Sequence, residues 1–271
     1  MKFEKYHGLG NDFIIFEEKE VLGMDYEALA KKICHRKFGI GADGMIIVAP
    51  SEKAPVFMKF YNADGSIAPM CGNGIRCFTH FIVNNGIIKD KTFKVDTLAG
   101  VLEVTWEETS DFMVRVYMGE PKYNPSQIPV NSDKTEFIKE RINTSYGEYE
   151  ISSLFMGTTH TVILTDNLKK ENIETVGKEI ENNSLFPVKT NVNFMEVKAK
   201  NEVDVNTWER GAGFTYACGT GCCASVVIGK RFGLLGDKVK VNVPGGHMYI
   251  ELQGDSVYMI GPSEKICEGN Y

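Results

Sequence analysis

The sequence predicts an α/β protein built from two similar halves, and three observations support this prediction. A Cys-Gly-x-Gly motif occurs twice, in PMCGNGIRC (69–77) and in YACGTGCCA (216–224). Short apolar runs typical of strands alternate with helical stretches around both copies. The length of 271 residues, with 43% hydrophobic and 24% charged residues, is ordinary for a globular protein and easily permits a sizeable core.

The similarity between the halves extends well beyond the two motifs. Without a gap, 58–74 aligns with 205–221, which places Tyr61 against Trp208 and Cys71 against Cys218. Roughly 60 residues upstream of each Cys, a Gly-led turn runs into an apolar segment, in GLGNDFIIF (8–16) and GTTHTVIL (157–164). Downstream, 95–104 matches 241–252 as a strand, a turn and a strand. Chance similarity of Gly-rich turns is the alternative, but landmarks in one order at nearly one spacing favour an internal duplication.

Local patterns place the elements along the chain. Apolar residues at helical spacing predict three helices, of which the last two end at a Gly, at 27–36, 75–86 and 221–233. Short apolar runs predict strands at 56–62, 112–118, 152–157, 192–197 and 256–261.

The domain boundary is expected in the middle of the chain. The segment 119–134 is rich in Pro, Asn and Ser and has the composition of a linker. We therefore expect an N-terminal domain over 1–118 and a C-terminal domain over 119–261. A last strand, at about 262–271, is expected to join the N-terminal domain.

Charge and hydropathy exclude several classes of partner. Thirty basic against 36 acidic residues give a net charge of −6, so no overall positive field attracts nucleic acid or anionic lipid. The start of the chain carries charge throughout, and no segment reaches the roughly 18 consecutive apolar residues that span a membrane. We expect a cytoplasmic protein with neither nucleic-acid nor membrane partners.

The cysteines indicate reduced thiols without a metal. The seven cysteines are an odd number, and they include no C-x-x-C pair and no His at zinc-ligand spacing. They lie at Cys34, Cys71, Cys77, Cys218, Cys222, Cys223 and Cys267. A disulfide framework and a structural metal site are therefore not expected.

Cys71 and Cys218 each stand directly before a predicted helix. The unsatisfied N–H groups and the positive end of the helix dipole are expected to lower the pKa of such a thiol. The same N–H groups, with small Gly residues beside them, can hold a substrate carboxylate. If the halves pack about a pseudo-twofold axis, the two thiols face each other. One thiolate then removes the α-proton of an amino acid while the opposite thiol protonates the other face, and neither pyridoxal phosphate nor a metal is required.

Other interpretations of these cysteines are open. A lone Cys is more often a small core hydrophobe, and we assign the other five cysteines to that class. A cysteine hydrolase would pair one Cys with a base such as His160, which leaves the second Cys-Gly-x-Gly site unexplained. A phosphate-binding loop lacks its signature here. A non-catalytic amino-acid-binding protein would use the same helix starts, and its thiols would not react with alkylating agents.

Seven motifs in order along nearly the whole chain resemble those of diaminopimelate epimerase. They are HGLGNDF (7–13), GIGADG (39–44), NADGS (62–66), MCGNGIRC (70–77), TNVNF (190–194), ERGAG (209–213) and ACGTGCCA (217–224). The resemblance implies two similar α/β domains, each a mixed sheet around a central helix. It also implies a substrate site in the cleft between the domains, no cofactor, an amino-acid substrate and a homodimer.

The resemblance also implies roles for individual residues. Cys71 and Cys218 are the two bases, and His160 and Glu209 assist them. Main-chain groups hold the reacting carboxylate at Gly72, Asn73, Gly219 and Thr220. Asn11 lines the site, and the far end of the substrate is bound by Asn62, Asn191 and Arg210. The alternatives are a surface ion pair for Glu209 and Arg210, and a structural histidine for His160.

Three departures from the family's pattern concern the substrate. Thr158 replaces an Asn that the family uses for the distal carboxylate of diaminopimelate, and Phe214 and Ile67 replace carboxylates, with Tyr216 added nearby. These changes favour a flat or apolar side chain, so we expect a different amino acid, with histidine as the first candidate. The alternative is neutral drift in an enzyme that acts on diaminopimelate or lanthionine.

Overall fold

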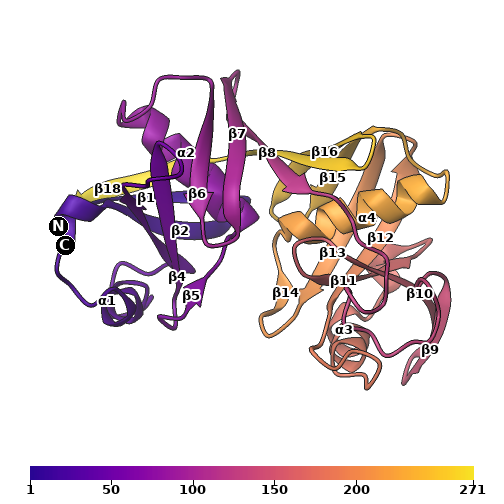
Figure 1. Ribbon diagram of the computed structural model, residues 1–271. Coiled ribbons are helices and arrows are strands. Elements are labelled where there is room, and N and C mark those ends of the chain that lie inside the picture. Colours follow the sequence, from indigo (N-terminus) through magenta and orange to yellow (C-terminus); the bar gives the residue numbers. More distant parts are fainter. The chain divides into compact units, whose positions relative to one another are not determined.

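The computed structural model describes all 271 residues and divides the chain into two compact units. Unit 1 comprises Met1–Tyr117 and Gly261–Tyr271, and unit 2 comprises Met118–Ile260 (Figure 1). Each unit holds two α-helices, which are α1 (Tyr26–Ile33) and α2 (Gly72–Asn84) in unit 1, and α3 (Ile173–Glu181) and α4 (Gly219–Arg231) in unit 2. Strands make up most of the rest, so the expected mixture of helix and mixed sheet is confirmed.

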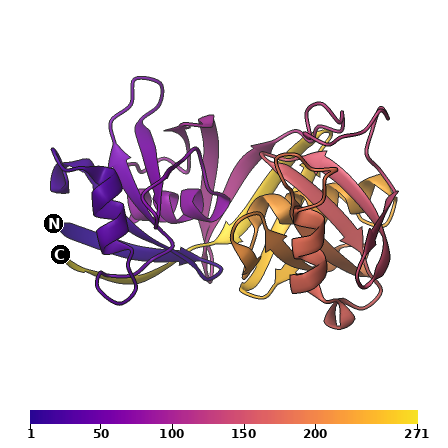
Figure 2. The same ribbon diagram turned by 90° about the horizontal axis from the view of Figure 1, so that it is seen from below.

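Unit 1 contains one mixed set of strands. These are β1 (Lys2–Gly8), β2 (Asn11–Glu17), β3 (Gly44–Ala49), β4 (Val56–Asn62), β5 (Ile67–Ala68), β6 (Thr92–Thr97), β7 (Gly100–Glu108), β8 (Phe112–Gly119) and β18 (Glu264–Asn270). β2 with β3 and β4 with β6 are parallel pairs, and the other pairs are antiparallel. The β1–β18 pair brings the chain ends together, and both views show the two termini side by side (Figures 1 and 2). The N-terminal amine lies 3.2 Å from the carbonyl oxygen of Tyr271.

Unit 2 repeats this order of elements. Its strands are β9 (Glu140–Thr144), β10 (Gly147–Phe155), β11 (Thr159–Leu164), β12 (Asn191–Ala199), β13 (Glu202–Glu209), β14 (Gly213–Thr215), β15 (Lys238–Val243), β16 (Gly246–Gln253) and β17 (Ser256–Pro262). β11 with β12 and β13 with β15 are the parallel pairs, as β2–β3 and β4–β6 are in unit 1.

The duplication is visible in the strand register. Tyr61 on β4 pairs with Ile67 on β5, and the aligned Trp208 on β13 pairs with Phe214 on β14. Both short hairpins lead into the helix that carries the Cys-Gly-x-Gly motif. The predicted alignment of 58–74 with 205–221 is therefore matched by the register of the two hairpins.

The two motif helices are the central ones. α2 packs against β1 to β4 and α4 packs against β10 to β13, and both bury most of their residues, not a single face. α1 and α3 bury narrower faces, such as Leu29, Ala30 and Ile33 on α1. A helix that is apolar on most sides requires cover on most sides, which the surrounding sheet supplies.

Both predicted Gly stops are present. Gly86 after α2 and Gly233 after α4 have φ values of 64° and 74°, and the residue after each Gly donates its N–H back into the last turn. The first predicted helix, at 27–36, is too long, because α1 ends at Ile33. Its continuation is replaced by a turn in which His35 Nδ1 accepts from the N–H groups of Lys37 and Phe38.

The expected linker between the halves is fixed onto unit 2. No strand or helix lies between β8 and β9, as the Pro- and Asn-rich composition predicts. However, Ile128 and Val130 are buried in the core of unit 2, and the carbonyl of Ile128 accepts from Thr159 Oγ1 at 2.9 Å. Two apolar residues thus fix the segment onto the unit that follows it.

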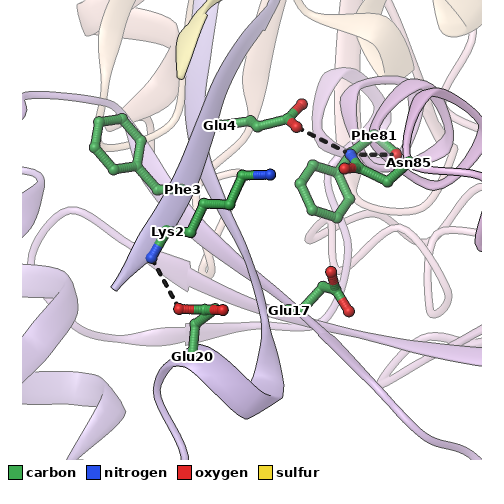
Figure 3. Close-up of a pocket in the computed structure, with 7 residues that line it drawn as sticks. All are labelled: Lys2, Phe3, Glu4, Glu17, Glu20, Phe81 and Asn85. Carbon is green, nitrogen blue, oxygen red and sulfur yellow. Dashed lines mark hydrogen bonds between the residues drawn. The ribbon is translucent and has the colours of Figure 1, made fainter. Parts of the chain in front are cut away.

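A small cavity lies beside the C-terminal end of α2, about 20 Å along the helix from Cys71. Figure 3 shows its lining, in which Glu4 accepts from Asn85 and Glu20 accepts from the backbone N–H of Lys2. The remaining lining residues are Phe3, Glu17 and Phe81. No helix in the structure is long and apolar enough to cross a membrane.

Candidate active site

Each Cys-Gly-x-Gly motif places its cysteine at the N-cap of a central helix. Cys71 caps α2 with extended backbone angles, and Cys218 caps α4 in the same way. The sequence prediction that both motifs open helices is confirmed, although both helices begin two or three residues earlier than the apolar pattern alone indicated. Gly72 and Asn73 on α2, like Gly219 and Thr220 on α4, belong to the first turn, whose N–H groups lack helical partners.

In unit 1, three predicted side chains come together at the start of α2. The Cys71 thiol donates to Asn11 Oδ1 at 3.6 Å, and Asn73 Nδ2 donates to the same oxygen at 3.2 Å. The Cys71 sulfur also accepts from the N–H of Gly74 at 3.5 Å. Asn62, at the end of β4, instead bonds to Ser66 Oγ at 2.9 Å within its own turn. Asn11 thus contacts both Cys71 and Asn73, and Asn62 is held by the turn.

In unit 2, the carboxyl of Glu209 lies beside the Cys218 thiol. Burial raises the pKa of the Glu209 carboxyl, and hydrogen bonds from Thr215 and from Cys218 act against this rise. The Thr215 hydroxyl donates to Glu209 Oε1 at 2.6 Å, and Cys218 Sγ lies 3.7 Å from Thr220 Oγ1. The carboxyl of Glu209 is therefore a proton acceptor beside the Cys218 thiol.

The expected low pKa is wrong for Cys218. Burial raises the pKa of this thiol well above its usual range, and the charge of Glu209 raises it further. The N–H groups of the helix stabilise a thiolate, but the free-energy cost of removing the charged sulfur from water exceeds this stabilisation. In this structure, Cys218 is a protonated thiol at neutral pH.

His160 on β11 is fully buried and neutral. Burial, together with the charge of Arg210, lowers the pKa of His160 to about 3. Asn193 Nδ2 lies 3.2 Å from His160 Nδ1 and donates to the carbonyl of Thr161, while Asn193 Oδ1 accepts from the Thr207 hydroxyl. These bonds fix the orientation of the Asn193 amide, so its NH₂ group faces His160. His160 Nδ1 therefore accepts a hydrogen bond, and the imidazole proton resides on Nε2. Because His160 Nε2 has no hydrogen-bond partner, His160 is not a fully satisfied structural histidine.

Two of the three residues expected at the far end of the substrate, Asn191 and Arg210, form one cluster with Thr158. Arg210 donates from Nη1 to the carbonyl of Val188 at 2.9 Å and from Nη2 to Thr158 Oγ1 at 3.3 Å. Asn191 accepts from the N–H of Arg210 at 2.9 Å and donates to the carbonyl of Thr159. Glu209 and Arg210 are therefore not a surface ion pair, because each has other partners.

Two residues of unit 2 that support this cluster were missed by the sequence analysis. Glu181, at the end of α3, is buried and accepts from Trp208 Nε1 at 2.7 Å and from the N–H of Gly211 at 3.1 Å. It thereby holds both sides of the Glu209–Arg210 segment. Asn193, which holds His160, lies two residues after the predicted Asn191 in TNVNF, and this second Asn was the available signal.

The side chains that depart from the family's pattern lie on the two short hairpins. Ile67 is 52% exposed, Phe214 is 48% exposed and Tyr216 is 64% exposed. None of them packs into the core of its own unit. Thr158, by contrast, contacts Arg210 and belongs to the distal cluster.

Comparison with known sequences gives one consistent result. The family described as "Diaminopimelate epimerase" matches residues 3–124 and 152–266. A protein named diaminopimelate epimerase from Alkaliphilus metalliredigens is 47% identical over 100% of this chain and 97% of its own length. A protein of the same name from Clostridium perfringens is 46% identical over 100% of this chain and 99% of its own.

Solved structures share the fold at low identity. A phenazine biosynthesis protein of the PhzF family from Bacillus anthracis superposes with a TM-score of 0.73 at 13% identity, over 99% of this chain and 98% of that one. A hydroxyproline epimerase from Agrobacterium vitis gives a TM-score of 0.71 at 15% identity, over 99% of this chain and 91% of that one.

Proposed function

We propose that this chain, which belongs to the diaminopimelate epimerase family, inverts one α-carbon of diaminopimelate between the LL and meso forms. The family to which the chain belongs is a family of epimerases, and one solved structure of the same fold is also an epimerase. The protein is therefore an isomerase. The observation that carries the proposal is a cysteine at the N-cap of each of two equivalent helices, in a chain that is 47% identical to a protein of that name.

The comparisons do not support histidine as the substrate. Proteins that are 46–47% identical over the whole chain are named diaminopimelate epimerase, which favours the alternative of drift at Thr158, Phe214 and Ile67. Phe214 and Ile67 are about half exposed on hairpins, where a change of side chain perturbs no core. Thr158 keeps a hydroxyl in contact with Arg210, so a polar group remains at that position.

In the proposed mechanism, Cys71 and Cys218 act on opposite faces of one α-carbon. N–H groups in the first turns of α2 and α4 bind the carboxylate and stabilise the charge that develops when the proton leaves. Cys218 rests as a thiol and begins as the acid. Glu209, buried beside it, accepts its proton when Cys218 must act as the base. His160 is neutral and offers an N–H donor from Nε2.

The other end of the substrate is assigned to the distal cluster. Arg210 provides a cation for the distal carboxylate, and Asn191 and Thr158 hold Arg210 and its segment in place. Asn62, beside Ser66, completes this assignment on unit 1. We propose that the reaction requires no cofactor.

A substrate panel tests the proposed function. Purified protein in D₂O, without added cofactor, is offered LL-diaminopimelate, meso-lanthionine and L-histidine, and α-deuteration and product chirality are measured. We expect exchange with diaminopimelate and none with histidine. Exchange with histidine alone would overturn the substrate assignment, and binding without any exchange would indicate the non-catalytic alternative.

Three further expectations stay proposals. We propose a homodimer, in keeping with the family resemblance, which light scattering on the purified protein tests by its mass. We propose a cytoplasmic location. We also propose that 1–118 with 262–271, and 119–261, are separate folding domains, since the cluster around Ile14 and Phe16 and the cluster around Val176 and Phe194 each draw on one of them.

A further inference from the structure

We propose that Asp43 and Arg76 are positioning residues that fix the amide of Asn11 with its oxygen toward the Cys71 thiol. The role given to Cys71 rests on the proposed function, whereas the orientation of the amide does not. Hydrogen bonds connect Arg76 to Cys71 through Asn73 and Asn11, and connect Asp43 to Cys71 through Asn11.

Four side chains of unit 1 form a directed hydrogen-bond series. Arg76 Nη2 donates to Asn73 Oδ1 at 2.8 Å, Asn73 Nδ2 donates to Asn11 Oδ1 at 3.2 Å, and Asn11 Nδ2 donates to Asp43 Oδ2 at 2.7 Å. We call this the Arg76–Asp43 series. It joins α2, the start of β2 and the loop before β3.

The two ends of the series determine its direction. A guanidinium group only donates hydrogen bonds, and an ionised carboxylate only accepts them. An amide between such ends must turn its oxygen toward the donor and its nitrogen toward the acceptor. The orientations of Asn73 and Asn11 therefore follow from the chemistry of Arg76 and Asp43.

Both ends are themselves held. Arg76 is fully buried, and it donates from Nε to the carbonyl of Pro262 and from Nη1 to the carbonyl of Gly72, each at 3.1 Å. Gly8 and Gly261 leave room for it, because a Cβ on either residue would lie 3.0 Å from the guanidinium.

Asp43 is fixed by a cation and by the backbone. Asp43 Oδ1 accepts from Arg36 Nη2 at 2.7 Å, and Asp43 Oδ2 accepts from the N–H of Asp12 at 3.2 Å. The other charged groups here are Asp12 on β2, which also binds Arg36, and Lys5 on β1, 2.9 Å from Asp12. Cys77 on α2 and Cys34 after α1 are further titratable thiols of this region.

The result is an acceptor facing the Cys71 sulfur. Asn11 Oδ1, at 3.6 Å, accepts the thiol proton but offers nothing to a thiolate, whereas the N–H of Gly74 stabilises a thiolate. The Arg76–Asp43 series therefore favours the protonated form of Cys71 against the effect of the helix. Unit 2 has no equivalent series, since the alignment places His160 opposite Asn11 and Cys223 opposite Arg76.

The variant Asp43→Asn tests this proposal with almost no change in volume. The new amide satisfies Arg36 with its oxygen and presents its NH₂ to Asn11, so the series loses its acceptor end and only Arg76, through Asn73, still orients the Asn11 amide. The Asn11 oxygen is then held less firmly toward Cys71, and the negative charge of Asp43 is gone, so both changes favour the thiolate. We expect iodoacetamide to alkylate Cys71 about tenfold faster at pH 7 than in the wild type, with the pH profile of the rate displaced to lower pH.

The rate is measured on the full chain without substrate, by mass spectrometry of the peptide that contains Cys71. Asp25→Asn is the matched control, because Asp25 caps α1 and Asn caps a helix equally well, so its profile should equal that of the wild type. Asn11→Leu, which removes the acceptor, should displace the profile in the same direction as Asp43→Asn.

An unchanged Cys71 profile in both Asp43→Asn and Asn11→Leu would overturn the proposal. Thermal unfolding of each variant identifies any that fails to fold, and the other variant then decides. Because alkylation requires no substrate, failure of diaminopimelate exchange in the wild type would refute the proposed function and leave this result standing.

Discussion

Cys71 and Cys218 occupy equivalent N-cap positions but have different neighbours. The Cys71 thiol donates to an amide, Asn11, which does not titrate, whereas Cys218 lies beside the buried carboxyl of Glu209. The two thiols therefore differ in how they gain and lose a proton, although the backbone around them is alike.

Replacing Glu209 by Gln separates the acidity of Cys218 from its catalytic use. The loss of the negative charge lowers the pKa of the Cys218 thiol, so iodoacetamide alkylates Cys218 faster at neutral pH. Turnover falls by about 10²- to 10⁴-fold, because the proton acceptor is gone. Glu148→Gln, at an exposed position on β10, is the control and should change neither rate. A slower alkylation of Cys218 in Glu209→Gln would contradict this account.

Asp12 predicts a defined acid sensitivity. Burial acts to raise the pKa of Asp12, but bonds from Arg36 and Lys5 outweigh it and lower the pKa to about 2. Because the folded-state pKa is lower than the unfolded-state value near 3.9, the ionised carboxylate stabilises the folded protein by about 2 kcal/mol at pH values above about 4. This stabilisation is lost as pH falls from about 4 toward 2. Urea unfolding should show Asp12→Asn less stable than wild type at pH 7, with the gap closing at pH 2 to 3. An equal gap at both pH values would refute the assignment.

At the scale of elements, equivalent glycines in the two central helices have different surroundings. A Cβ on Gly74 in α2 would meet Met58 Cε at 3.2 Å, which a flexible side chain accommodates. A Cβ on Gly221 in α4 would overlap Asn193 Oδ1, and Asn193 is held by His160, Thr161 and Thr207.

Alanine at these two positions should therefore have opposite consequences. Gly74→Ala should be neutral or stabilising, because Ala is favoured over Gly in a helix by up to about 1 kcal/mol. Gly221→Ala should reduce the free energy of unfolding by about 1–3 kcal/mol through overpacking. Urea unfolding of both variants measures the difference, and equal stabilities would show that Asn193 has room to move.

α3 contributes through Glu181, which holds Trp208 and Gly211 on either side of Arg210. Glutamine offers one acceptor oxygen where glutamate offers two, so Glu181→Gln frees one side of this segment. We expect KM for diaminopimelate to rise several-fold, by about 1 kcal/mol of binding, with kcat affected less. Glu179→Gln, on the same helix, binds only Ser145 and is the control. A fall in kcat with unchanged KM would contradict a role in positioning Arg210.

At the scale of the whole molecule, the duplicated landmarks predicted both central helices and both cysteine N-caps, because those features depend on local sequence. Asp43, Arg76, Glu181 and Asn193 were not predicted as supporting residues. Their partners lie far along the chain, as Asp43 and Asn11 do at a separation of 32 residues. Such contacts exist only once the strands are paired, and a single sequence contains no local pattern for them.

One sequence expectation failed for an energetic reason that also acts over distance. The helix dipole predicted a low pKa for Cys218, but burial and Glu209 dominate. The composition of 119–134 predicted a linker, and no helix or strand forms there, but it did not predict that burial of Ile128 and Val130 fixes the segment onto unit 2. For the substrate, a few changed side chains favoured histidine, whereas similarity over the whole chain favours diaminopimelate.

The central claim is that both thiols act on one α-carbon, and serine variants in D₂O test it most directly. Wild type, Cys71→Ser and Cys218→Ser are incubated with LL-diaminopimelate, and α-deuterium and product chirality are followed, with Cys267→Ser as the control on exposed β18. The account predicts meso product labelled at the inverted carbon for wild type and control, and near loss of epimerisation in each of the other two variants. Full epimerisation by either Cys71→Ser or Cys218→Ser would contradict it.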